Sequence, residues 1–300
     1  MVAVRLLTCI VANKRKRTVA VISALPGAGH FSAAVLYITM GLLAGLVALG
    51  IRAETPDARV AVRALWEQPF GPALLVVVAS GATCLVVWRL LQAFWDLEGK
   101  GRSFIGICRR TRYLLGAMFY ASVPICAARI LFHVPTPSGE QLAEQAASAV
   151  IHFPFGWSLV LGTGMGFSIA GAYYLYRMCR GNFEGIFHCE KMTDTQRKLY
   201  FAFGRLGCAA RGIIFLVIGY YLVLAGWNVD PQQVEGQAGA LHIISQQPLG
   251  PMMLGFVAIG LVALGAFSFA ELRYGRIPRE KLARIVDYAH GRHTRQIKEF

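Results

Sequence analysis

Apolar residues along this chain gather into six long runs separated by short polar segments. Each run is long enough to cross about 30 Å of hydrocarbon, which takes roughly 20 residues of helix. Inside hydrocarbon every backbone N–H and C=O must be paired within its own segment, so we expect each run to form a helix. The runs cover residues 31–51, 71–94, 113–134, 155–176, 206–227 and 250–270.

Three of these runs open with the same short phrase. It reads Pro, then Phe or Leu, then Gly, with a second Gly ten residues after the first. A Pro at the start of a helix loses nothing, because its missing N–H would be unpaired there. A glycine near mid-membrane lets a neighbouring backbone approach closely, so we expect the second Gly to lie in a helix contact. The three copies are Pro69, Gly71 and Gly81; Pro154, Gly156 and Gly166; and Pro248, Gly250 and Gly260.

This repeat predicts the fold class: an all-α membrane protein with six transmembrane helices in three two-helix repeats. Two crossings per repeat is an even number, so the repeats point the same way and form a pseudo-threefold bundle. Within each pair we expect a short amphipathic helix before the Pro. The predicted segments are a basic N-terminal segment (1–28), repeat 1 (29–98), repeat 2 (99–181), an interfacial linker (182–204), repeat 3 (205–274) and a basic amphipathic tail (275–300).

Charge then predicts the orientation of the helices. The net charge is +14, and Lys and Arg concentrate before the first run, after the second and fourth runs, and in the tail. The connections on the opposite side hold three Arg, then none, then none. Because positive residues accumulate in cytoplasmic loops, both termini are predicted to be cytoplasmic. The same placement explains the basic balance without a nucleic-acid partner.

The chain resembles a known family at the phrases Gln68–Gly71, Gln247–Gly250 and Gly207–Gly212, together with its hairpin pattern. These resemble the bacterial membrane proteins catalogued as domain of unknown function 1206, over about residues 28–273. The resemblance implies a multi-pass protein of the bacterial inner membrane with three hairpins. The family has no assigned activity, so the resemblance implies no mechanism. Its Ala-Arg-Gly phrase stands here in the third copy alone, since Ala33 and Leu115 replace the Arg elsewhere.

Two ionisable residues near the cytoplasmic ends of the last two runs are candidate functional residues, because a charge inside a membrane is costly. Arg211 lies about a turn and a half into the fifth run, and Glu271 follows the sixth. We hypothesise that they form an intramembrane ion pair that locks the third hairpin or gates a cytoplasmic opening. The alternative is an Arg that extends to lipid phosphate while Glu271 lies in water.

Motifs for chemistry are missing from the sequence. There is no phosphate-binding loop, no H-E-x-x-H and no G-x-S-x-G. No His lies deep in a run where it would hold a haem, so we predict no cofactor, no metal and no enzyme activity. The tail from 278 to 300 places apolar residues on one face and basic ones on the other. Such a helix lies on anionic lipid, and the alternative is a helix that binds a protein partner.

Three classes of function remain for a protein of this kind, and a membrane enzyme is the least favoured because these motifs are missing. The first is a structural, assembly or partner-binding membrane protein. The second is a small-solute or ion transporter along the pseudo-threefold axis. Transport requires polar side chains that converge at mid-depth, whereas small-residue stripes such as Ser158, Gly162, Gly166 and Ala170 favour helix packing. The few hydroxyl side chains near the centres of the runs are Thr39, Thr83, Ser122, Thr163 and Ser168.

Overall fold

The computed structural model consists of helices and the loops that connect them. It describes residues 2–94, 104–151, 153–181, 183–185, 187, 190 and 192–275. Within these ranges there is no strand, and one isolated bridge joins Phe187 to Gly275. The long helices are α1 (Val2–Ala48), α3 (Gly71–Phe94), α4 (Phe104–Leu131), α6 (Gly156–Arg180), α7 (Asp194–Asn228) and α9 (Gly250–Tyr274). The short ones are α2 (Ala58–Trp66), α5 (Gly139–Ile151), the 3-10 helix η2 (Pro231–Gln233) and α8 (Gln237–Ser245).

Five helices of the described chain are long and apolar enough to cross a membrane. They are α3, α6, α7, α9 and the Ile22–Ala48 part of α1. The apolar part of α4 is shorter, Gly116–Leu131, because basic residues occupy the first turns of that helix. The all-helical class and the membrane character predicted from the sequence are therefore confirmed.

Two helices run through boundaries that the sequence analysis placed between segments. α1 continues through residue 28 although it contains Pro26, and α7 continues through residue 204. α7 begins with a capping box. The Thr193 hydroxyl accepts from the Gln196 N–H, and the Gln196 side chain accepts from the Thr193 N–H. The tail beyond residue 275 lies outside the described residues.

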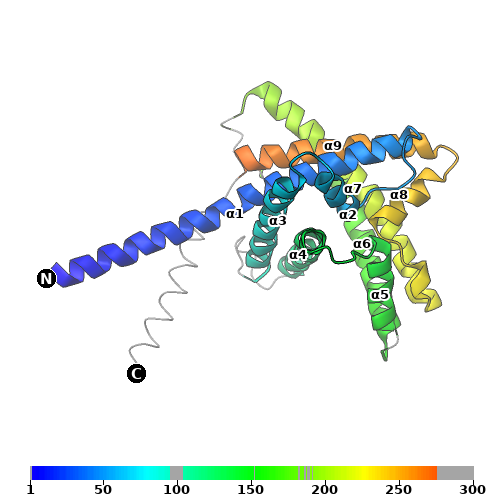
Figure 1. Cartoon of the computed structure of the whole chain (residues 1–300), viewed down its shortest axis with the longest axis horizontal. Coiled ribbons are helices and arrows are strands. Elements are labelled where there is room, and N and C mark those ends of the chain that lie inside the picture. The colour runs from blue at the N-terminus through cyan, green and yellow to red at the C-terminus, as the bar shows by residue number, and fades with distance from the viewer. Residues whose placement is uncertain are drawn as a thin grey trace.

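The long helices pack in the order α4, α3, α1, α9, α7, α6, each against the next. α1 and α9 lie side by side and antiparallel, while α3 and α7 cross them obliquely (Figure 1). The N-terminal half of α1 projects away from the other helices (Figure 1). We call the end that carries α2, α5 and α8 the loop end, and the opposite end the terminal end.

The three Pro-Phe/Leu-Gly phrases adopt one local geometry, in which each glycine begins a long helix. The N–H of Gly71, Gly156 and Gly250 donates to the carbonyl three residues earlier, at 2.8, 2.8 and 2.7 Å. A methyl group on any of these glycines would overlap a backbone carbonyl at the end of the preceding short helix. Glycine is therefore required at these three positions, because no side chain fits into the turn.

The second glycine of each phrase has different surroundings in the three copies. A methyl group on Gly81 would lie 2.6 Å from the Ala28 carbonyl oxygen, and one on Gly260 would lie 2.9 Å from the Leu206 carbonyl oxygen. Gly166 has no atom within 4 Å of the same point. The expected helix contact therefore forms at Gly81 and Gly260 and not at Gly166, because α4 and α6 do not pack along each other within the described residues.

These surroundings predict unequal effects of one substitution. Gly260→Ala should lower the stability of the detergent-solubilised protein by about 1–3 kcal/mol, because the new methyl group must displace a backbone carbonyl. Gly166→Ala, the matched control, should leave it unchanged. Thermal melting followed by size-exclusion chromatography measures both. An equal loss in the two variants would contradict the packing described above.

Candidate functional site

Arg211 lies among tyrosines from three other helices. Its guanidinium donates to the Tyr37 hydroxyl of α1 and lies 5.1 Å from the centre of that ring. The Tyr174 ring of α6 is 5.6 Å away. The Tyr37 hydroxyl in turn bonds to that of Tyr120 in α4 at 2.8 Å. We call these four residues the tyrosine–arginine cluster.

The tyrosine–arginine cluster provides partners for the partly buried charge of Arg211 without a carboxylate. Tyr37 and Tyr120 are 4% and 8% exposed, so their hydroxyl groups need partners inside the protein. Within the described residues Arg211 makes no ion pair, and its charge is balanced by a hydroxyl and by the faces of two rings. Cation–π contacts of this kind contribute about 0.5–2 kcal/mol each. The cluster therefore joins α1, α4, α6 and α7 at one point.

The structure does not bring Arg211 and Glu271 together as the sequence analysis proposed. Glu271 instead lies 3.1 Å from the His30 ring nitrogen of α1, and both side chains are largely buried. Each residue thus holds α1 by a different contact. The reason is that α1 packs against α9, which places His30 beside Glu271 near the terminal end.

The tyrosines of the cluster were not among the residues predicted from the sequence. Those candidates were charges and small hydroxyl side chains near the centres of the runs. Tyrosine in a membrane helix normally lies at the interface with water, where its hydroxyl is hydrated. Tyr37 and Tyr120 lie well inside their apolar segments, and a tyrosine there needs a buried partner. A tyrosine inside an apolar segment was therefore the sequence signal that could have predicted the cluster.

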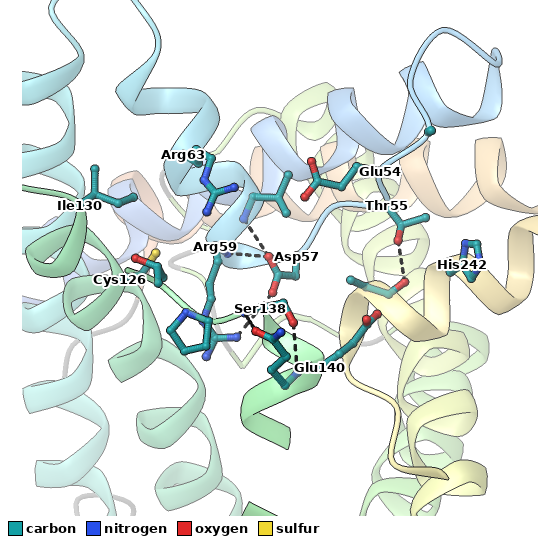
Figure 2. A pocket seen from close by; sticks show the side chains of 17 residues that line it. Glu54, Thr55, Asp57, Arg59, Arg63, Cys126, Ile130, Ser138, Glu140 and His242 are labelled. Atoms are coloured by element: carbon teal, nitrogen blue, oxygen red, sulfur yellow. Dashed lines mark hydrogen bonds and ion pairs between the residues drawn. The ribbon is translucent and has the colours of Figure 1, made fainter. Parts of the chain in front are cut away.

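A cavity of about 510 Å³ opens at the loop end between α2, α4, α5 and α8 (Figure 2). Asp57 begins α2 and accepts from the N–H groups of Arg59 and Val60, both at 2.8 Å. Its second oxygen lies 3.7 Å from the Arg59 guanidinium. We call this cavity the loop-end pocket.

Contacts between residues that are far apart in the sequence connect the walls of the loop-end pocket. The Thr55 hydroxyl donates to the Ala238 carbonyl of α8 at 2.9 Å. A methyl group on Gly139, at the start of α5, would lie 2.9 Å from the Arg59 guanidinium and would overlap the Asp57 carboxylate. The pocket is therefore assembled from α4 and from the connections within all three pairs of long helices.

Glu140 lines this pocket, and the Glu235 carboxylate lies close to it beside α8. A methyl group on Gly239 would overlap the Glu235 carboxylate and lie 3.1 Å from a Glu140 oxygen. Burial raises the pKa of Glu235 above its ordinary value, the neighbouring Glu140 raises it further, and His242 lowers it. This corner of the pocket therefore favours a proton or another cation near the two carboxylates.

The cluster predicts a specific effect of removing one hydroxyl group. Tyr37→Phe should destabilise the protein by about 1–3 kcal/mol, because Arg211 and Tyr120 both lose a buried partner. The control is Tyr220→Phe, an equal change on a side chain that is 58% exposed. We expect the control to stay within about 0.5 kcal/mol of the parent protein in thermal melting. Matching losses would show that the Tyr37 hydroxyl is not a structural contact.

Comparisons with known proteins show the family of the chain. The sequence matches the family described as Domain of Unknown Function (DUF1206) over residues 28–96 and 206–275. The Uncharacterized protein YxxB of Bacillus subtilis (strain 168) is 32% identical over 254 residues, which cover 84% of this chain and 91% of that relative. No solved structure matches the chain. The protein therefore belongs to the DUF1206 family, as its repeated phrases predict.

Proposed function

We propose that this protein is a six-span protein of the bacterial inner membrane that acts by assembly or partner binding. Both termini are cytoplasmic in this proposal, and the helices form three like-oriented repeats. The proposal gives the protein no catalytic step. The observation that carries it is the tyrosine–arginine cluster, in which the Arg211 charge is used to hold helices together.

The position of α4 supports a sixth crossing. α3 and α6 both begin at the loop end, where α2, α5 and α8 lie around one pocket. The chain must therefore return from the terminal end to the loop end between residues 94 and 156. α4 makes this return, since its Tyr113 ring lies under Arg89 of α3 and its Ile130 lines the pocket. Its 28 residues reach about 42 Å as a helix.

Local geometry supports the repeat. The three glycine turns share one hydrogen bond and one steric requirement. In addition, the second long helix of each pair packs on the first long helix of the next: α3 on α4, α6 on α7, and α9 back on α1. That cyclic order is what a pseudo-threefold arrangement requires. The family match covers the first and third of the proposed repeats.

The distribution of Lys and Arg supports the proposed orientation of the helices and the proposed contact of the tail with anionic lipid. The basic residues that the structure describes near the start of α4 and the end of α6 lie at the terminal end, as expected for a cytoplasmic side. The tail from residue 275 onward carries the amphipathic basic pattern, and we propose that it lies on anionic lipid. The same tail is the proposed contact for a protein partner. No nucleic acid is part of the proposal.

Transport along the axis is the second candidate, and the loop-end pocket favours it because an open polar cavity is a natural first binding site. The hydroxyl side chains near the middle of the long helices argue against transport. Each bonds to a carbonyl of its own helix three or four residues earlier: Thr39, Thr83, Ser122, Thr163 and Ser168. Side chains bonded in this way do not need a water-filled path. Assembly is therefore the preferred function.

The proposed orientation is tested by single cysteines in a chain whose native cysteines are replaced by serine. A cysteine at Glu67, exposed after α2, should react with a membrane-impermeant maleimide in intact cells. A cysteine at Glu184, exposed after α6, should react only after the membrane is permeabilised, because it lies on the cytoplasmic side. Labelling of both sites in intact cells would refute the six-span arrangement.

The proposed role is tested by purification in mild detergent from native membranes. We expect another protein to copurify in constant ratio with the full chain and to be lost when residues 276–300 are deleted. Mass spectrometry and quantified gel bands measure the ratio. Isolation of the full chain alone, with uptake of solute by liposomes that contain it, would instead establish the transport function.

A further inference from the structure

The loop-end pocket holds two charged side chains that have no partner of their own. Arg63 enters from α2 and Glu140 from α5. Neither makes an ion pair or a side-chain hydrogen bond within the part of the chain that the structure describes. Figure 2 shows them on opposite sides of Asp57. Arg63 is exposed and Glu140 is partly exposed, so both are accessible to a ligand that enters the pocket.

The other charges of the pocket are already used within the protein. Asp57 begins α2 and lies beside Arg59. Glu54 pairs with Arg52 at 3.1 Å. These contacts fix the walls and neutralise each other. Among the Asp, Glu and Arg side chains that line the pocket, Arg63 on the α2 side and Glu140 on the α5 side remain for a ligand.

The anionic side is strengthened by a second carboxylate. A methyl group built on Gly239 would reach both Glu235 and Glu140, so the two acids share one small region. Like charges at this separation disfavour each other, and a cation placed beside them relieves the repulsion. An ammonium group fits this need, because it donates three hydrogen bonds and carries a compact charge.

The size and the remaining lining suit a small molecule. The cavity of about 510 Å³ falls in the range of roughly 300–1,000 Å³ that small-molecule sites occupy. Apolar lining comes from Val60, Cys126, Ile130 and Pro137. The pocket thus offers an apolar wall in addition to the two charges.

We propose that the loop-end pocket binds a small zwitterion, an amino acid or short peptide with an apolar side chain. Arg63 receives its carboxylate, Glu140 receives its ammonium group, and the apolar wall receives its side chain. A purely anionic ligand would leave Glu140 unpaired, and a purely cationic one would leave Arg63 unpaired. This binding site goes beyond the assembly role and holds whichever way the protein is oriented in the membrane.

The test measures binding to the purified full chain in detergent by isothermal titration calorimetry. The probes are L-leucine and glycyl-L-leucine, with N-acetyl-L-leucine lacking the ammonium charge and L-leucine methyl ester lacking the carboxylate. We expect saturable binding of at least one zwitterion and at least about tenfold weaker binding of both derivatives. Equal affinity for either derivative, or no saturable zwitterion binding at millimolar concentration, would overturn the proposal.

Charge-neutral variants locate the site. Arg63→Gln and Glu140→Gln should each weaken zwitterion binding about tenfold. Glu144→Gln, on the same helix α5, and Arg180→Gln, at the terminal end of α6, are exposed controls that should bind as the parent does. If all four variants bind alike, the site is not this pocket and the proposal fails. Should a pocket variant not fold, the derivative series on the unaltered chain still decides.

Discussion

Close backbone contact between helices is the constraint on which this structure depends. Among lipid tails an apolar side chain gains little by moving to another helix, so association relies on tight packing and on polar contacts. Glycines supply the packing where α1 meets α9, since methyl groups on Gly41 and Gly265 would lie 2.8 and 2.9 Å from carbonyl oxygens of the opposite helix. That contact brings the first and last described helices together.

The two long helices of the middle pair are held to the neighbouring pairs and not to each other: α4 packs on α3, and α6 packs on α7 through glycine contacts of the same close kind. α4 and α6 do not pack along each other in the described chain, and Gly166 has no near neighbour. Tyr120 of α4 bonds to Tyr37, and Tyr174 of α6 lies over Arg211. The cluster therefore attaches both helices of this pair to the neighbouring pairs. A directional hydrogen bond and two ring contacts fix a geometry that apolar packing alone would leave open.

α4 contributes to both the tyrosine–arginine cluster and the loop-end pocket, at separate points along its length. α4 contributes Tyr120 to the cluster and Cys126 to the pocket floor. These residues are about 9 Å apart along the helix axis, and the side chain of Val123 between them is 1% exposed. An apolar layer thus divides the buried charge from the open cavity. A pocket that takes a ligand and a core that holds the helices can therefore act independently.

The amino-acid sequence by itself determined the helical class, the apolar segments and the start of three long helices at the Pro-Phe/Leu-Gly phrases. These features follow from local rules: apolar length, backbone pairing within a segment, and a proline that loses no hydrogen bond at the start of a helix. Only the tertiary structure decided that Arg211 meets Tyr37, that Glu271 meets His30, and that Arg63 and Glu140 share a pocket. The reason is that spacing fixes which face of a helix a residue occupies, whereas the rotation and neighbours of each helix decide what that face meets.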